Sequence, residues 1–311
     1  MLKFNNKVLK FNNNWLERTG PIDPNNPLNL PPFTVRFLFE DENYDPNGLE
    51  FYNPYTDEPI IGVIMRRHSY APNVWDITYN STDWTSLFWN KWSDGEWHYD
   101  PDYHNWNNYF VPAFGVRILG ANTTGVLNMD MAFNNNHQLV SIDNKFDLST
   151  CLSMNYTFVQ SSVEYLPEFD LSNVTSLERC FAQSWNLKEI PNYDLSSATN
   201  LVGLFSDNYK VTNAPNLITS NCTDFNQMFL NCHSLTNVPL LDTSKATNVD
   251  LMFGACVSVE SGALDLYNQM SSQTTPPSSH NYTFLRCGLD TISGLDELNQ
   301  IPQDWGGNLV I

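Results

Sequence analysis

A sequence motif of about 24 residues recurs between Phe133 and Phe253, and it constrains the fold more than any other feature of the sequence. One phenylalanine marks each copy, and successive markers are 25, 23, 24, 24 and 24 residues apart. These landmark phenylalanines are Phe133, Phe158, Phe181, Phe205, Phe229 and Phe253. A period in the twenties is typical of a solenoid, whose coils bury an apolar face only by stacking on their neighbours. The sequence therefore predicts a solenoid with one coil per repeat.

Each repeat holds two apolar patterns that predict its local structure. Apolar residues lie at positions i, i+3 and i+4, as in Leu177, Cys180 and Phe181, which is the spacing of one face of a short helix. A threonine precedes each group, where its hydroxyl is placed to cap free amides; these are Thr175, Thr199, Thr223 and Thr247. Short apolar pieces that end in proline then predict one parallel strand per coil. We therefore expect an α/β leucine-rich-repeat solenoid, with a short helix and a short parallel strand in each ~24-residue coil.

The sequence outside the repeat divides into three further parts. Residues 1–32 contain five prolines among Asn and Asp, which favours an anchor segment with an extended arm, or alternatively a poorly ordered tail. Residues 33–117 alternate apolar and polar positions around 33–39 and 75–79 and contain a short apolar run at 60–65, which predicts a small β-rich region that covers the first coil of the solenoid at 118–260. The 24-residue period ends after Glu260, and residues 261–311 are expected to form a C-terminal cap with helices at 263–270 and 293–300.

The cysteines follow the phase of the repeat. Cys232, Cys256 and Cys287 each lie three residues after a phenylalanine, and Cys180 directly precedes Phe181. Residues in one phase of successive coils stack in a ladder, so these cysteines are expected to be small buried apolar residues. The sequence holds no C-x-x-C pair, which makes a metal site or a disulfide framework the weaker interpretation.

Residues 89–109 are dense in aromatic side chains and have neither helical nor strand periodicity, so a long loop is expected. Flat rings beside Asn and Asp are typical of carbohydrate- or protein-binding surfaces, although the same rings are also suited to filling a joint between two parts. The candidate binding residues in this loop are Trp97, Tyr99, Tyr103, Trp106 and Tyr109. In the solenoid, recognition is expected at positions that vary between coils, namely Glu189, Asn213 and Asn237 on the strand side.

The sequence gives little support for catalysis. Asp94, Glu96, Asp100 and Asp102, beside Trp97 and Trp106, form the single cluster suited to glycan hydrolysis by paired carboxylates. Acids in an Asn-rich loop are more often solvated or turn-forming, and no protease, esterase or nucleotide-binding motif occurs. We therefore expect a protein that is not an enzyme and has no catalytic residue.

Two patterns suggest a metal and neither is complete. Asp41, Asn43 and Asp45 match the first spacings of a calcium loop, but Pro46 stands where the turn glycine belongs and Tyr52 occupies the twelfth position. Two histidines six residues apart in a loop, His98 and His104, are too few for a zinc site. No metal and no cofactor are expected.

The charge balance excludes some partners. Thirty-four acidic residues against fifteen basic ones give a net charge of −19, which argues against binding to nucleic acid or to an anionic membrane. No run of eighteen apolar residues occurs, and the first residues lack the features of a secretory signal peptide. We therefore expect neither membrane insertion nor export by a leader.

Two stretches carry a resemblance to a known repeat. Residues 225–239 and 242–256 are similar to the leucine-rich repeats of bacterial surface proteins of the BspA-like type, in which "D-T-S-x-V-T-N-M-x-x-M-F-x-x-C" recurs. The resemblance covers about residues 118–290. Residues 73–84, 119–126 and 300–305 also resemble proteins of crAss-like bacteriophages that infect Bacteroidales, and of their hosts' genomes. The resemblance implies adhesion and surface recognition.

The expected function follows from the resemblance together with the lack of signal-peptide features. We expect a virion structural protein of head or tail fibre or decoration type, made in the host cytoplasm, that presents the solenoid to a bacterial surface glycan or protein or to another virion protein. Residues 1–32 are expected to dock on other virion proteins, and a homotrimer is plausible for a fibre. The alternatives are a bacterial cell-surface adhesin, which needs a leader or an anchor, and a glycan-degrading enzyme.

Overall fold

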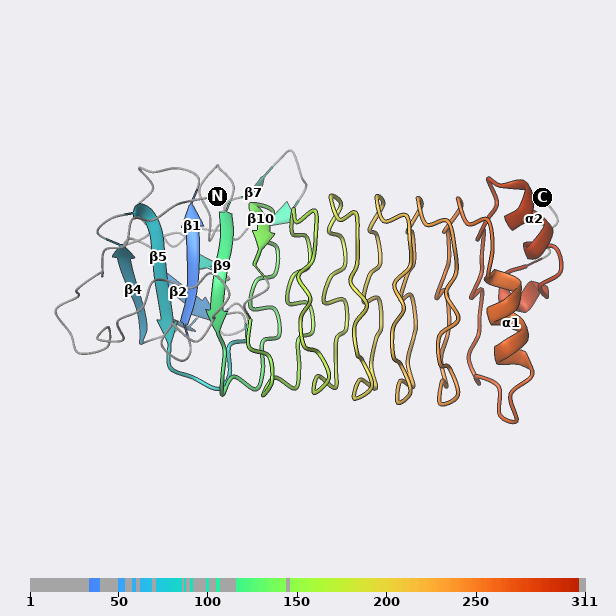
Figure 1. The fold of residues 1–311 in the computed structure, drawn as a ribbon, viewed down its shortest axis with the longest axis horizontal. Coiled ribbons are helices and arrows are strands. Elements are labelled where there is room, and N and C mark those ends of the chain that lie inside the picture. Colours follow the sequence, from blue (N-terminus) through green and yellow to red (C-terminus); the bar gives the residue numbers. More distant parts are fainter. Residues whose placement is uncertain are drawn as a thin grey trace.

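A computed structural model describes residues 34–39, 50–53, 58–59, 62–68, 71–85, 87, 90–91, 99–100, 105–106, 116–143 and 146–307. The molecule is elongated, with a β-sheet at one end, a long series of stacked turns in the middle and two helices at the other end (Figure 1). The predicted anchor at 1–32 and the incomplete calcium-loop pattern of Asp41, Asn43 and Asp45 lie outside the described residues.

Five strands form a mixed sheet at the first end, in the order β10-β9-β1-β5-β4. The strands are β1 (Thr34–Phe39), β4 (Val63–His68), β5 (Ala71–Tyr79), β9 (Val116–Asn122) and β10 (Leu139–Ile142). β10 pairs parallel with β9, and the other neighbours pair antiparallel. The strands predicted at 33–39, 60–65 and 75–79 are confirmed as β1, β4 and β5, with boundaries that differ by a few residues.

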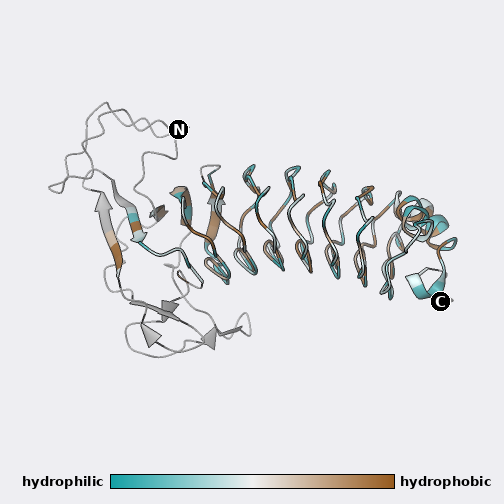
Figure 2. Cartoon of the chain, turned by 90° about the horizontal axis from the view of Figure 1, so that it is seen from below, coloured by the Kyte–Doolittle hydropathy of each residue, from teal (hydrophilic) through white to brown (hydrophobic). Residues whose placement is uncertain are grey.

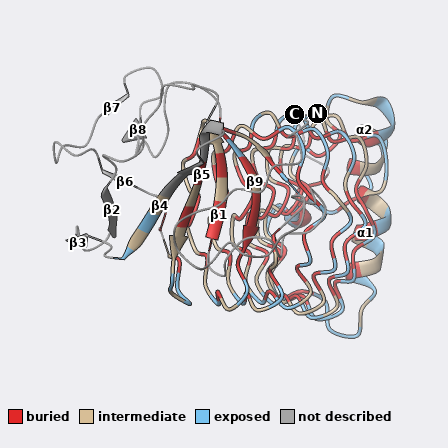
Figure 3. Ribbon diagram, turned by 60° about the vertical axis from the view of Figure 1, so that its left-hand side comes forward, coloured by how far each residue is buried: buried red, intermediate tan, exposed pale blue. Residues whose placement is uncertain are grey.

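Alternation of apolar and polar residues explains how this sheet meets the first turn of the stack. Val35 and Phe37 of β1 and Trp75 and Ile77 of β5 are buried, because residues two apart on a strand face the same side. The Phe37 ring lies 6.4 Å from that of Phe133, the first landmark phenylalanine. The apolar face of the sheet therefore covers the start of the repeat (Figure 3).

Five shorter strands complete the first part of the chain. β2 (Glu50–Asn53) pairs with β3 (Glu58–Pro59) and with β6 (Asn90–Lys91), and β7 (Tyr99–Asp100) pairs with β8 (Asn105–Trp106). The expectation of a loop without strands at 89–109 is therefore wrong at β6, β7 and β8. Two-residue strands are too short to produce a period of two that sequence analysis can detect.

Residues 123–290, here called the turn stack, wind so that each repeat lies beside the next (Figure 1). Isolated parallel bridges join one column of residues from turn to turn, at Asn128, Ser153, Ser176, Asn200, Asp224, Asn248 and Ser279. The landmark rings stack along the interior: Phe181 and Phe205 are 5.8 Å apart, and Phe229 and Phe253 are 5.2 Å apart with an interplanar angle of 8°. The polar bends face outward, and the buried stretches lie inside (Figure 2).

The predicted α/β leucine-rich-repeat solenoid is wrong, because no described turn of the stack contains a helix followed by a strand. The described α-helices are α1 (Ala263–Ser271), which lies between the turns of Phe253 and Phe284, and α2 (Ile292–Leu298), which follows the stack, and the regular structure is mostly sheet. The longest sheet is the mixed one at the first end, and it is not built from repeats. The repeated segments are successions of tight turns.

The hydrogen bonds around Phe181 show why a helical spacing arises without a helix. The amide of Cys180 donates to the carbonyl of Leu177 within the same turn, at 3.1 Å. The amides of Arg179 and Phe181 donate instead to Val202 and Leu204 of the next turn, at 2.7 and 3.1 Å. Arg179 has a left-handed φ of 49°, which breaks the helical path and turns alternate amides toward the neighbouring turn. Tight turns also bring positions i, i+3 and i+4 to one face, so the apolar pattern is shared with a helix.

The repeated threonines have a different role from the one predicted. The hydroxyls of Thr199, Thr223 and Thr247 donate to the carbonyl of the corresponding threonine one turn earlier, at 3.3, 3.1 and 3.0 Å. Their amides donate to the same carbonyls at 2.8 to 3.0 Å. Thr175 bonds to Leu152 in the same way. The prediction of helix caps is therefore wrong, and these threonines form a ladder between turns.

The cysteine prediction is confirmed. All six cysteines are free thiols, and all six are buried. The Cys232 Sγ lies 3.2 Å from the Phe205 carbonyl oxygen, and the Cys256 Sγ lies 3.1 Å from that of Phe229, each one turn earlier. Cys232 and Cys256 thus occupy an interior ladder, as their shared phase predicts.

Two helices and a short 3-10 turn close the far end. The predicted helices at 263–270 and 293–300 are confirmed as α1 and α2, and η3 (Gln303–Trp305) follows them. The N-cap of α1 is Gly262, and the carboxylate of Glu297 accepts hydrogen bonds from the amides of Gly262 and Leu264. The end of the chain thereby ties α2 to the start of α1.

Candidate binding surface

The aromatic residues predicted to bind lie mostly outside the described part of the chain. Trp97, Tyr103 and Tyr109 are not described, and neither are Asp94, Glu96, Asp102, His98 and His104. Tyr99 and Trp106 are opposite each other in the β7–β8 pair, of which the structure describes the backbone. The predicted binding role of this segment remains a prediction.

Glu189, Asn213 and Asn237 share one side of the turn stack. Glu189 and Asn213 are exposed and Asn237 is partly exposed. Glu189 forms a parallel bridge with Tyr165, and Asn237 forms one with Ser261. The preceding residues bond from turn to turn, as Lys188 does to Glu164 and Thr236 does to Thr212, each at 2.9 Å. The structure thus brings these three predicted positions into one column, at 24-residue intervals.

The sequence analysis did not single out a set of rings, of which Tyr165 belongs to this column and the other four share a phase of the repeat four residues before it. We call the five residues His137, Tyr165, Trp185, Tyr209 and His233 the ring strip. Tyr165, Trp185 and Tyr209 are 53%, 37% and 40% exposed, so solvent reaches part of each ring. His137 stacks on Trp185 with centroids 6.0 Å apart, and Tyr209 stacks on His233 at 5.0 Å. Four of the five lie four residues after a landmark phenylalanine, which was the available signal in the sequence.

Polar and charged groups border the ring strip. Lys188 Nζ donates to Glu164 Oε2 at 2.8 Å and also lies 5.6 Å from the centre of the Tyr165 ring. The hydrogen bond from Lys188 lowers the pKa of Glu164, and the same bond raises the pKa of Lys188. Lys210 Nζ donates to Asn186 Oδ1 at 2.7 Å. Exposed ion pairs such as Lys188–Glu164 add little to folding stability. The fold therefore does not depend on this pair, and its charged groups can contact a ligand.

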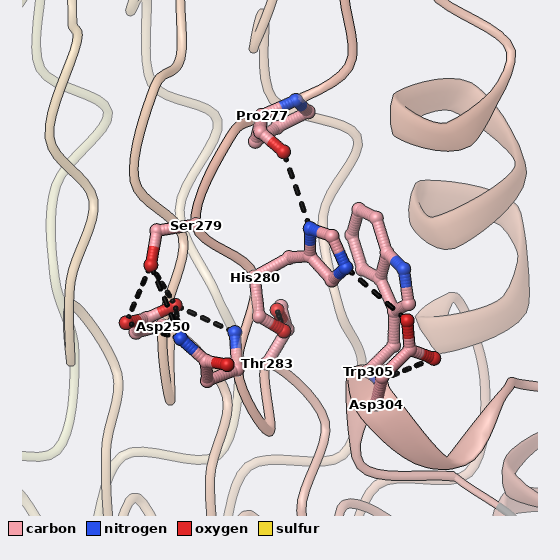
Figure 4. Close-up of polar contacts among 8 residues, drawn as sticks. Asp250, Pro277, Ser279, His280, Thr283, Asp304 and Trp305 are labelled. Carbon is pink, nitrogen blue, oxygen red and sulfur yellow. Dashed lines mark hydrogen bonds and ion pairs between the residues drawn. The ribbon is translucent and has the colours of Figure 1, made fainter.

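A second polar cluster lies at the junction with the C-terminal helices (Figure 4). The His280 ring stacks on Trp305 with centroids 4.3 Å apart, and its nitrogens lie 3.2 Å from the Pro277 carbonyl and 3.3 Å from Asp304 Oδ2. Ser279 Oγ donates to Asp250, at 2.9 and 2.8 Å from the two carboxylate oxygens. Because the serine hydroxyl bonds to the aspartate and the histidine bonds elsewhere, this cluster is not a nucleophile–base pair. It fastens the last turn to the cap.

The described residues offer no assembled metal site and no helix long and apolar enough to cross a membrane. No group of three or more His, Cys, Asp or Glu side chains within that part of the chain is placed to hold a metal ion. The statement about membrane-spanning helices is likewise limited to these residues. The ring strip, with its amide and lysine border, combines ring faces with polar groups, which is the chemistry typical of a binding surface.

Comparison with known proteins adds one family. Residues 154–265 match the model of a family described as "Mycoplasma protein of unknown function, DUF285". That family is related to the BspA-like repeat proteins, and the match covers much of the turn stack, including Trp185, Tyr209 and His233 of the ring strip. No curated protein and no solved structure matches the chain.

Proposed function

We propose that this chain is a non-catalytic recognition protein that binds a bacterial surface through the ring strip. One observation carries the proposal: partly exposed rings recur along one side of the turn stack, beside a column of exposed Glu and Asn side chains. Stacked repeats present extended, rigid surfaces, and aromatic residues with amides are enriched where proteins recognise ligands. A rigid array of this kind binds without losing much conformational entropy.

The setting that we propose is a bacteriophage particle, in which this chain is a structural component of fibre or decoration type. Its support is the resemblance of residues 73–84, 119–126 and 300–305 to proteins of crAss-like bacteriophages. The resemblance of the repeats to those of BspA-like proteins also implies adhesion, which supports the recognition role. The two parts of the proposal are separate, since a surface-binding protein need not belong to a particle.

Binding of labelled full-length protein to host cells tests the recognition role. The double variant Trp185→Ala/Tyr209→Ala removes two rings of the strip, and we expect it to lose most of the binding. The control is Ile218→Ala/Leu240→Ala, which removes apolar side chains that are 54% and 64% exposed at other positions of the stack. Equal binding by the wild type and the ring variant, or equal loss in the two variants, would contradict the proposal.

Mass spectrometry of purified particles tests the setting. We expect the protein in stoichiometric amount with the other structural proteins of the particle. Its presence in a host membrane fraction and its absence from particles would refute the particle role, while the cell-binding result would still decide the recognition role.

A further inference from the structure

We propose that residues 1–18 dock on the outside of their own turn stack, over Ile218 and Leu240. This contact uses other positions of the stack than the ring strip and does not depend on the proposed recognition function. Three observations support it: two exposed apolar side chains, a row of carboxylates beside them, and a basic and apolar segment of the same chain that lies outside the described residues.

Two apolar side chains are exposed on neighbouring turns of the stack. Among the described large apolar side chains of the turn stack, Ile218 and Leu240 are the most exposed, at 54% and 64%. The hydroxyl of Thr219 donates to the carbonyl of Asp242 at 2.9 Å, so these two segments are neighbours at one bend. Leu241 is buried between exposed Leu240 and exposed Asp242, which places Leu240 and Asp242 on the same outer side. The bend therefore presents an apolar patch that a bound segment would cover.

Aspartates occupy the position of Ile218 on other turns. Asp194 forms a parallel bridge with Ile218, and Asp170 and Asp242 have the same phase at intervals of 24 residues. We call these three exposed aspartates the acid row. Each is held through Oδ1 by the serine two residues later, as in the 2.6 Å bond from the Ser172 hydroxyl to Asp170. The other oxygen of each carboxylate has no hydrogen-bond partner among the described residues. The acid row therefore holds acceptors in fixed orientations for ammonium groups.

Nearby charges leave the bend negative. Lys245 lies within electrostatic reach of Asp242, and its Nζ donates to the side chain of Asn221 one turn earlier. Glu168 adds an exposed carboxylate two residues before Asp170. One ammonium group against four carboxylates does not neutralise this side of the stack, so the patch favours a segment that is both apolar and basic.

Residues 1–18 have this complementary composition. They contain four of the fifteen basic residues of the chain and one of its thirty-four acidic residues, which gives a net charge of +3 in a chain of net charge −19. Large apolar residues stand between the bases, at Phe4, Val8, Phe11 and Trp15. The segment can therefore pair with the acid row and cover the apolar patch in one contact.

The register of the sheet brings the chain to the start of this bend. β1 begins at Thr34, which lies opposite Asn122 of β9. Ala121, the residue before Asn122, forms a parallel bridge with Phe146, which directly precedes Asp147. Asp147 lies at the same bend as the acid row, one repeat before Asp170. The chain thus enters the described structure in line with the aspartates.

The intervening residues are long enough for the segment to reach the patch in one molecule. Hydrogen-bonded chains lie ~4.8 Å apart, so the roughly six steps from β1 to the turn of Asp242 cover ~29 Å. Residues 19–33 span up to ~46 Å at ~3.1 Å per residue in the extended form that their prolines favour. A tether of this length raises the effective concentration of residues 1–18 at their own stack, which favours this contact over one with a second molecule.

Carbodiimide cross-linking of the full-length protein, followed by mass spectrometry, tests the contact. The reagent joins an amine to a carboxylate as an amide and itself becomes a urea, so it adds no spacer and links groups that already touch. Lys188 and Glu164, which are 2.8 Å apart, provide a positive control in every sample. A mixture of unlabelled and isotopically labelled protein distinguishes links within one molecule from links between two.

Two double variants accompany the wild type. Ile218→Ala/Leu240→Ala removes the apolar patch, and Trp185→Ala/Tyr209→Ala is the matched control, because it removes two exposed side chains from the ring strip. The Lys188–Glu164 link should form equally in all three proteins, which shows that the stack is folded in each.

We expect links from Lys3, Lys7 and Lys10 to the acid row within single molecules. The patch variant should give about fivefold fewer of these links, because it removes apolar surface that the segment covers. The ring variant should stay within about twofold of the wild type.

Four results would overturn the inference. The first is no link from the three lysines while the Lys188–Glu164 link forms, and the second is linkage to Glu189 and Glu260 as often as to the acid row. The third is linkage between labelled and unlabelled molecules, which would place residues 1–18 on a second copy. The fourth is an equal yield from the wild type and the patch variant. Cell binding through the ring strip is measured separately, so the failure of either proposal leaves the other standing.

Discussion

Left-handed backbone conformations at fixed positions define each turn of the stack. They occur two residues before and two residues after the landmark phenylalanine, as at Gln227 (φ 57°) and Asn231 (φ 60°) around Phe229. A residue other than glycine in this conformation costs about 1–2 kcal/mol. The amides that the conformation redirects offset this cost, since Gln227, Phe229 and Asn231 all donate to the next turn at 2.8 to 2.9 Å. The sequence must therefore avoid side chains that the left-handed region excludes.

Ala255 offers a direct test, because it has a φ of 57° and donates its amide to Leu285 at 2.7 Å. A β-branched side chain crowds the left-handed backbone, so Ala255→Val should lower the free energy of unfolding by about 1–2 kcal/mol. Ala255→Gly relieves the crowding and serves as the control. Urea denaturation measures both, and a valine variant as stable as the glycine variant would contradict the assigned conformation.

The thiols should be unreactive in the folded protein. Burial raises the pKa of Cys151, Cys222 and Cys232 to about 12, and it raises the pKa of Cys180, Cys256 and Cys287 as well. The thiolate is the reactive form, so a thiol reagent at pH 8 should label none of the six without denaturant and all six in 6 M guanidinium. Rapid labelling of any cysteine in the native protein would refute its burial in the interior.

Three aspartates at one bend of alternate turns link stability to acid pH. Asp147, Asp194 and Asp242 accept hydrogen bonds from the serine two residues later, and these bonds lower the pKa of each carboxylate. A lowered folded-state pKa contributes stability that is fully present above the unfolded value of about 3.9 and is lost as the pH falls through the folded value. The triple Asp→Asn variant should therefore be less stable than the wild type at pH 7, and the difference should shrink below pH 4. A difference that does not change with pH would show that the carboxylate charge is not responsible.

At the scale of elements, the column of stacked phenylalanines holds neighbouring turns together. Phe205 is fully buried, with ring centroids 5.8 Å from Phe181 and 5.4 Å from Phe229. Phe205→Ala leaves a cavity between two turns and should cost about 3–5 kcal/mol of stability. Phe205→Leu retains most of the volume and should cost less. Thermal unfolding compares the two, and a small effect of the alanine variant would show that the turns do not depend on the ring column.

Sequence analysis found the period and several elements but not the structure of the turn. Strands β1 and β5 were predictable because Val35 and Phe37, and Trp75 and Ile77, alternate clearly with polar residues. Leu177, Cys180 and Phe181 suggested a helix because tight turns give the same apolar spacing. What excludes the helix is the left-handed φ of Arg179, and arginine carries no sequence signal for that conformation.

The candidate site was predictable in part. Glu189, Asn213 and Asn237 share one phase of the repeat, and the structure places them in one column on the outside of the stack. The ring strip was missed because its members differ in type, so Trp185, Tyr209 and His233 do not look like a repeated residue. Their shared distance from the landmark phenylalanines becomes meaningful once the turns are known to stack.

At the scale of the whole molecule, the two ends protect the stack. The five-stranded sheet packs on Phe133 at one end, and at the other the amides of Tyr282 and Phe284 donate to Asp304 and Trp305 of the cap, at 2.9 and 2.8 Å. Terminal units of this kind are needed because an open stack exposes apolar surface and unpaired backbone groups. The ring strip lies between the two ends, on turns that neighbours support from both sides.

The most direct test of the central claim, that the ring strip is the binding surface, is hydrogen exchange measured on the full-length protein with and without host cell-envelope fragments. We predict slower exchange in peptides that cover 185–189, 209–213 and 233–237, and no change in those that cover 173–177, 197–201 and 221–225 on the threonine ladder. Protection of the threonine ladder without protection of the ring strip would contradict the account.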